Sequence, residues 1–147
     1  MRQGLTRRLP YTPEQLFALV GDVEQYPRFV RWVTALRTWN RRESTDGSIL
    51  LDAEAKVRFS VIRERFSTRV KLDPQALAID VALLSGPFKR LENHWRFEAV
   101  GDGAELHFEI DFEFGSRFLE TLLAANLERA IAKLVACFED RAKELYG

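Results

Sequence analysis

The C-terminal stretch of this chain constrains its fold most strongly, because it carries one continuous helical pattern. From Ser116 to Tyr146, apolar side chains recur at the spacing of an α-helix, and no Gly or Pro interrupts them. Ser116 is a suitable N-cap, and the pattern predicts one helix about 45 Å long. Because such a helix is rarely stable alone, its apolar stripe needs a partner surface. The stripe comprises Leu119, Leu122, Leu123, Leu127, Ala130, Ile131, Leu134, Val135, Phe138, Ala142 and Leu145.

The region before this helix is typical of an antiparallel sheet. Apolar and polar residues alternate in five segments, and weaker strand patterns cover 3–9 and 33–43. Asp-Gly, Asp-Pro, Gly-Pro and Gly-Asp-Gly sequences mark the turns. We therefore expect about seven strands in a meander, with one face exposed to water and the other curled around the helix. The clear segments are 49–61, 62–72, 77–83, 91–97 and 106–114.

Two short helices are expected between the first two strands. A capping signal at Thr12 starts a helix that ends near Gly21, and a second turn begins at Asp22 and is limited by Pro27. The aromatic segment around this turn either plugs one end of the core or forms the wall of a ligand cavity. Its aromatic side chains are Tyr26, Phe29 and Trp32.

Composition places the chain among globular proteins. It has 147 residues, of which 46% are hydrophobic and 30% charged, so we expect a single domain over 1–147. The single cysteine, Cys137, cannot form an internal disulfide. The N-terminal arginines precede no apolar segment, and no apolar run is long enough to span a membrane. We expect a cytoplasmic protein without a signal peptide.

The order of elements resembles the helix-grip fold of START-like lipid-transfer domains and aromatic polyketide cyclases, an α+β fold in which a curved antiparallel sheet holds a long C-terminal helix. Three segments narrow the resemblance: 22–32 (DVEQYPRFVRW), 86–97 (GPFKRLENHWRF) and 111–114 (DFEF). They are similar to those of coenzyme Q-binding START proteins and of their relatives, the RatA-like ribosome-association toxins. Val33 departs from the small or Cys-like residue expected after Trp32.

This resemblance implies a hydrophobic ligand bound between the sheet and the long helix. For the quinone branch, the ligand would be ubiquinone or a related polyprenyl lipid that supports respiratory electron transfer, with peripheral contact at the inner membrane. For the toxin branch, the partner would be the large ribosomal subunit. A cyclase-like enzyme is the third alternative. Apart from the bound lipid, no cofactor is expected.

The residues themselves give little sign of catalysis. His94 and His107 fall on the polar, outward phase of their strands, so neither is placed to act as a base in a cavity. Two outward histidines and one helical cysteine provide no metal-ligand set. Cys137 fits the pattern of a small buried hydrophobe, and Glu64 is the only inward acid–base group. We therefore expect a protein that is not an enzyme.

Polar residues on inward phases are the more informative candidates, because their burial costs free energy unless they find a partner. Glu64, Thr68, Asn93 and Asn126 are of this kind. They either reach water or backbone at strand ends, or contact a polar head group whose apolar tail lies against nearby aromatic and Leu side chains. The full candidate ligand set is Tyr26, Phe29, Trp32, Phe59, Glu64, Phe66, Phe88, Asn93, Trp95, Leu123, Asn126 and Leu127.

Charge is segregated along a chain with zero formal net charge. Residues 28–71 hold eleven Lys or Arg and five Asp or Glu, whereas 98–113 hold six acidic residues and no basic ones. Four cations predict a basic stripe on one strand, either a solvated face with ion pairs or a contact surface for ribosomal RNA or anionic lipid. These cations are Arg63, Arg65, Arg69 and Lys71.

Overall fold

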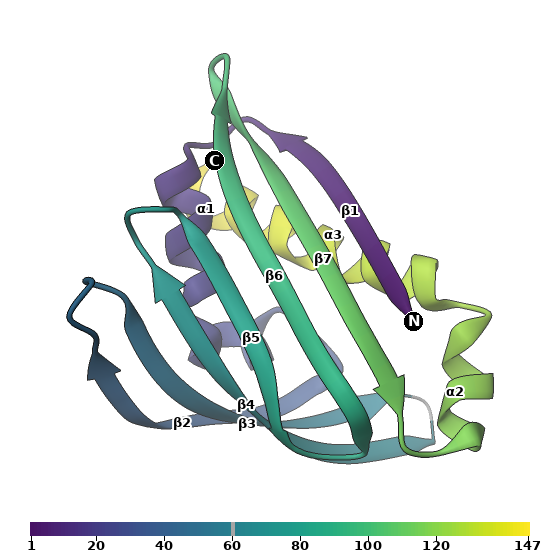
Figure 1. Cartoon of the computed structure of the whole chain (residues 1–147). Coiled ribbons are helices and arrows are strands. Elements are labelled where there is room, and N and C mark those ends of the chain that lie inside the picture. Colours follow the sequence, from purple (N-terminus) through teal and green to yellow (C-terminus); the bar gives the residue numbers. More distant parts are fainter. Residues whose placement is uncertain (60) are drawn as a thin grey trace.

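Seven strands form one antiparallel sheet in a computed structural model that describes residues 1–59 and 61–147 (Figure 1). The strand order is β1-β7-β6-β5-β4-β3-β2, so the chain meanders from β2 to β7 and β1 pairs with β7. The elements are β1 (Arg2–Leu9), α1 (Pro13–Gly21), the 3₁₀ helix η1 (Val23–Arg28), β2 (Val33–Glu43), β3 (Ile49–Phe59), β4 (Ile62–Asp73), β5 (Ala78–Ser85), β6 (Phe88–Val100), β7 (Gly103–Phe114), α2 (Arg117–Ala124) and α3 (Leu127–Tyr146).

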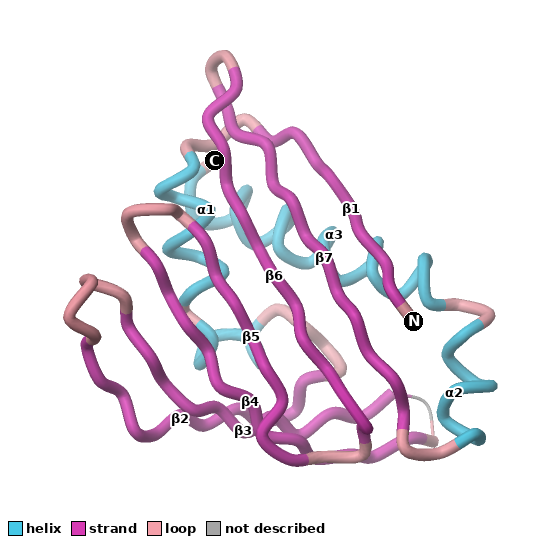
Figure 2. Tube along the Cα trace, viewed as in Figure 1, coloured by secondary structure: helices cyan, strands magenta, loops and turns pink. Residues whose placement is uncertain are grey.

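The sheet curves around α1 and α3, which lie on the same face of it (Figure 2). This confirms the predicted meander and the helix-covered face. The strand predicted over 49–61 ends at Phe59, and Ser60 lies outside the described residues. The helix start at Thr12 is also confirmed: its hydroxyl accepts from the Gln15 amide at 3.1 Å, and Gln15 Oε1 accepts from the Thr12 amide at 3.0 Å.

The prediction of one continuous helix over 116–146 was wrong. α2 ends at Ala124, and α3 begins at Leu127 after Asn126, whose φ of −124° and ψ of 12° are not helical. The two helices serve different surfaces, because Leu119 of α2 joins a small apolar cluster at the end of β7 whereas α3 packs on the main core. Asn is a weak helix former, so the change of path occurs where it costs least.

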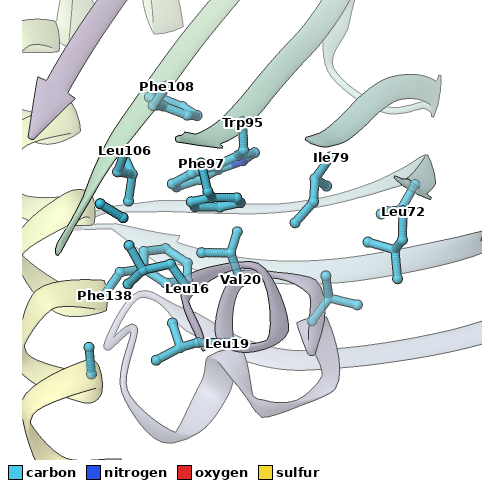
Figure 3. Close-up of a cluster of buried hydrophobic side chains, with 14 of the residues drawn as sticks. Leu16, Leu19, Val20, Leu72, Ile79, Trp95, Phe97, Leu106, Phe108 and Phe138 are labelled. Carbon is cyan, nitrogen blue, oxygen red and sulfur yellow. The ribbon is translucent and has the colours of Figure 1, made fainter. Parts of the chain in front are cut away.

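The main core lies between α1, α3 and the middle of the sheet (Figure 3). Phe138 of α3 is 2% exposed and packs among Leu16 and Val20 of α1 and the buried side chains of β6 and β7. Its ring lies 5.2 Å from that of Trp95. This core fixes α3 against the sheet and leaves the space near α2 to be filled separately.

None of the helices in the described part of the chain has the length and hydrophobicity of a membrane-spanning segment.

Candidate ligand cavity

An apolar cavity of about 270 Å³ lies at the α2 end of the molecule. Its walls come from the ends of β3 and β4, the middle and end of β7, the start of β6, and both C-terminal helices. The alternating pattern of the strands explains this placement, because every second side chain of an antiparallel strand points to the helix-covered face. The helices contribute Leu119, Leu123, Ala130, Ile131, Lys133 and Leu134.

Aromatic rings form most of the sheet side of the cavity. Phe88 packs edge-on against Phe66 at 5.6 Å and lies stacked with Phe114 at 5.1 Å. Trp32 meets Phe59 edge-on at 6.3 Å. Such pairs contribute free energy beyond the area they bury, so this wall is well defined while its surface remains apolar.

Two charged side chains lie on the cavity lining, Glu64 of β4 and Lys133 of α3. Glu64 is half-buried and stands opposite Val57 of β3. Arg37 of β2 forms its ion pair with a different carboxylate, that of Glu54 on β3. The cavity therefore combines a large apolar surface with two polar groups of opposite charge.

The aromatic residues Tyr26, Phe29 and Trp32 were expected either to plug the core or to form a cavity wall, and the structure shows both roles. Trp32 lines the cavity. Tyr26 and Phe29 instead plug the core, each with its ring 5.2 Å from that of Phe138. The Tyr26 hydroxyl donates to the Val20 carbonyl at 2.5 Å, and burial, with the nearby Asp22 charge, raises the pKa of Tyr26. This hydroxyl is committed to the core.

Among the other predicted ligand residues, Phe59, Glu64, Phe66, Phe88 and Leu123 line the cavity. The remaining four do not.

Trp95 is 5% exposed and closed off in the main core. The Asn93 side-chain oxygen accepts from Trp95 Nε1 at 3.2 Å, so it is engaged beside the cavity rather than within it. Leu127 packs between the two apolar clusters. Asn126 is exposed at the break between α2 and α3. Thr68, an inward polar residue, is 6% exposed and likewise absent from the lining.

Several lining residues were not predicted. Phe108, Ile110 and Phe114 lie on the inward phase of β7, a signal that the sequence did carry. Lys133 carried no such signal, because it lies off the apolar stripe of its helix. Long lysine side chains lay their methylene groups along apolar surfaces, which accounts for its place in the lining.

On the outer face, the predicted basic stripe is shorter than expected. Arg69 Nε donates to Asp52 Oδ1 at 3.0 Å, and Asn40 Nδ2 donates to Asp52 Oδ2 at 3.1 Å. These bonds hold the pKa of Asp52 below its usual range. Lys71 stands opposite Asp80 of β5. Acidic neighbours therefore stand beside Arg69 and Lys71 at one end of the stripe. At the other end, Arg63 and Arg65 remain exposed.

Both histidines lie on the outer face, as predicted. His94 Nδ1 lies 2.6 Å from Asp80 Oδ1, and His107 Nδ1 lies 3.3 Å from Thr6 Oγ1. Neither lines the cavity. Cys137 is half-buried on α3, and burial, followed by the Asp140 charge, raises the pKa of its thiol, which disfavours the reactive thiolate.

The family of the chain follows from residues 9–139, which match the model for polyketide cyclase / dehydrase and lipid transport proteins. The chain belongs to this family. Its architecture is the helix-grip fold that the family shares with the START superfamily, and a START superfamily protein from Mycobacterium smegmatis superposes with a TM-score of 0.74 at 22% identity, covering 98% of each chain.

Similar proteins include ribosome association toxins and a coenzyme Q-binding protein. The ribosome association toxin RatA of Pseudomonas aeruginosa is 35% identical over 95% of this chain and 93% of its own. The mitochondrial coenzyme Q-binding protein coq10 of Schizosaccharomyces pombe is 30% identical over 94% of this chain and 84% of its own.

Among solved structures, the 18 kDa protein CC1736 of Caulobacter crescentus is 54% identical, with a TM-score of 0.84 over 100% of this chain and 99% of its own.

Proposed function

We propose that this protein is a non-enzymatic carrier that binds a hydrophobic molecule, ubiquinone or a related polyprenyl lipid, in the cavity beside α2. The observation that carries the proposal is the chemistry of the lining, which is aromatic and aliphatic except for Glu64 and Lys133. A polyprenyl quinone has the matching parts, an apolar tail and a ring with two carbonyl acceptors. The similarity to coq10 supports the same ligand class.

The size of the cavity determines which part of such a ligand fits. At 270 Å³ it lies near the lower end of small-molecule sites, roughly 300–1,000 Å³. It can hold a head group or a few isoprene units, so a long tail must extend through the opening. An apolar occupant would remove this apolar lining from contact with water, which is favourable.

The two charged groups differ in what they offer a quinone. A carbonyl oxygen accepts hydrogen bonds, and an ionised carboxylate also only accepts, so Glu64 would reach it through a bridging water. The Lys133 ammonium is a donor and can bond to the carbonyl directly. We therefore assign Glu64, which is half-buried, as a water-mediated head-group contact, and the exposed Lys133 as a direct contact for a carbonyl that lies at the edge of the cavity.

Filling the cavity tests this proposal. Ala130 of α3 is half-buried and lines the cavity, whereas Ala136 of the same helix is exposed. Ala130→Phe should weaken binding of a short-chain ubiquinone by tenfold or more, because the new ring occupies the ligand's place, and Ala136→Phe should bind like the wild type. Isothermal titration calorimetry measures both, with the thermal midpoint as the folding control. Unchanged binding by A130F, or none by the wild type, would contradict the proposal.

A ribosome-binding role is the second candidate. It is favoured by the similarity to the ribosome association toxins and by the exposed cations Arg63 and Arg65. It needs no occupied cavity, so the apolar lining would remain unexplained. A cyclase-like activity has less support. The Zhui aromatase/cyclase of Streptomyces sp. R1128 is 15% identical, which shows the shared fold alone, and the lining offers Glu64 and Lys133 as its only titratable side chains.

A further inference from the structure

The end of the molecule that opens to the cavity carries two unusual surfaces side by side. The first is a hollow of about 460 Å³ on the outer face of β3 and β4, where four exposed cations gather. We call it the basic hollow, and its cations are Lys56, Arg58, Arg63 and Arg65. The second is a group of exposed apolar side chains, which we call the entrance rim: Phe59, Val61, Phe118 and Leu122.

The strand register forces the cations of the basic hollow together. Lys56 stands directly opposite Arg65, and Arg58 directly opposite Arg63. Side chains opposite each other in an antiparallel pair have Cβ atoms about 5 Å apart, and like charges placed so are destabilising. Two successive like-charge pairs therefore cost stability, and an anionic partner would relieve that cost.

Other cations on these strands have internal partners. Arg37 pairs with Glu54 at 3.2 Å, and Arg69 pairs with Asp52 at 3.0 Å. No salt bridge within the described residues involves a cation of the basic hollow. Glu64 borders the hollow as well as the cavity, but it forms no salt bridge with any of the four cations within the described residues. The hollow thus has four cations against one carboxylate, which leaves an excess of positive charge.

The entrance rim surrounds the way into the cavity. Val61 is 81% exposed and Phe118 is 65% exposed, and both line a surface hollow of about 580 Å³. This hollow shares Ile62, Glu64, Pro87 and Leu119 with the ligand cavity, so it lies directly outside the cavity at its α2 end. In Figure 1 the end of β3 and the start of β4 lie near α2, and Val61 and Phe118 line the same hollow.

We propose that the entrance rim and the basic hollow form a docking surface for an anionic lipid bilayer. The rim enters the apolar region, and the cations bind the headgroup phosphates. A nucleic acid would satisfy the cations but leave Val61 and Phe118 in water, whereas a bilayer accommodates both surfaces. Docked in this way, the cavity opens directly into the lipid. The purpose of this docking rests on the proposed carrier function, whereas the geometry of the docking surface does not depend on that function.

Vesicle binding tests the docking surface. Vesicles of phosphatidylcholine alone and of phosphatidylcholine mixed with phosphatidylglycerol are sedimented with the wild type and three double variants. Arg63→Gln with Arg65→Gln removes two cations of the hollow, Val61→Asp with Phe118→Asp replaces exposed rim residues, and Arg8→Gln with Arg41→Gln makes the same charge change at exposed positions elsewhere. All of these side chains are exposed, so no variant should lose thermal stability, and R63Q/R65Q should unfold at a slightly higher temperature because it relieves both like-charge pairs.

The wild type should bind the anionic vesicles more tightly than the neutral ones, and added salt should weaken that preference. R63Q/R65Q should lose about fivefold in affinity per cation, V61D/F118D should lose most binding, and R8Q/R41Q should bind like the wild type. Equal binding of both vesicle types by the wild type, or equal losses in R63Q/R65Q and R8Q/R41Q, would overturn the docking. The docking would also be overturned if the wild type bound ribosomal subunits but no vesicles, and if R63Q/R65Q lost that binding to the subunits.

Quinone binding in solution separates this proposal from the carrier function. V61D/F118D should still bind a short-chain ubiquinone, because its substitutions lie outside the cavity lining. If vesicles bind as expected while A130F leaves quinone binding unchanged, the carrier function fails and the docking surface stands.

Discussion

Gly86 holds the cavity wall in place, because no other residue fits between its neighbours. Its φ is +152°, and a Cβ added there would lie 2.5 Å from Phe66 Cβ. The turn that enters β6 thus lies directly against the Cα and Cβ of Phe66, whose side chain lines the cavity. Any side chain at position 86 must displace either the turn or Phe66.

Gly86→Ala should therefore destabilise the protein by about 1–3 kcal/mol and weaken quinone binding as well. Gly4→Ala is the matched control, since a Cβ at Gly4 meets only the Phe108 carbonyl oxygen at an ordinary 3.5 Å. It should change stability by less than about 1 kcal/mol, in the stabilising direction. Urea unfolding measures both variants. A G86A protein as stable as G4A would show that the wall can shift without cost.

At this scale, strand phase allowed several cavity residues to be predicted. Phe59, Glu64 and Phe66 followed from alternation alone, because a strand's side chains alternate whatever the rest of the chain does. Tyr26 and Asn93 could not be assigned in this way. Their polar atoms bond to Val20 and Trp95, and only the folded core shows that those partners are within reach.

α2 is the most weakly anchored element around the cavity. Leu119 is its single buried residue, and its apolar Phe118 and Leu122 remain exposed. α3, in contrast, buries Val135 and, in the main core, Ile131, Phe138 and Ala142. Because local opening is easiest where few apolar side chains are buried, α2 is the element suited to let a ligand in.

Hydrogen exchange should detect this difference. Amides of α2 should exchange faster than those in the middle of α3, and a bound ubiquinone should slow α2 through contacts with Leu119 and Leu123. The A130F variant provides the control, since the same addition should leave its α2 amides unchanged. Protection of ligand-free α2 equal to that of α3 would rule out its role as the entrance.

The two C-terminal helices also show that sequence periodicity is insufficient to predict a break between helices. The stripe over 116–146 fitted a single helix, because periodicity reports which residues face inward and not which surface they face. Leu119 and Phe138 belong to different clusters, so the chain bends at Ala125 and Asn126 to supply both. The meander itself was predictable, since each turn signal and each change of phase is local.

For the molecule as a whole, the cavity lies beside the main core and shares Phe108 and Ile131 with it, while its far side is closed by α2. The larger cluster around Phe138 stabilises the fold, and the smaller cluster around Leu119 borders the cavity. A change on the α2 side of the cavity wall, away from Phe108 and Ile131, can therefore alter ligand choice without unfolding the core. This separation fits a family whose members with the same fold are named for lipid transport, coenzyme Q binding and ribosome association.

The most direct test of the carrier function is mass spectrometry of the lipids extracted from the protein after purification from its native host. Wild type and A136F should each release a polyprenyl quinone in stoichiometric amount, and A130F should release little, because its cavity is filled. No lipid from a folded wild-type protein, or equal amounts from all three proteins, would contradict the account.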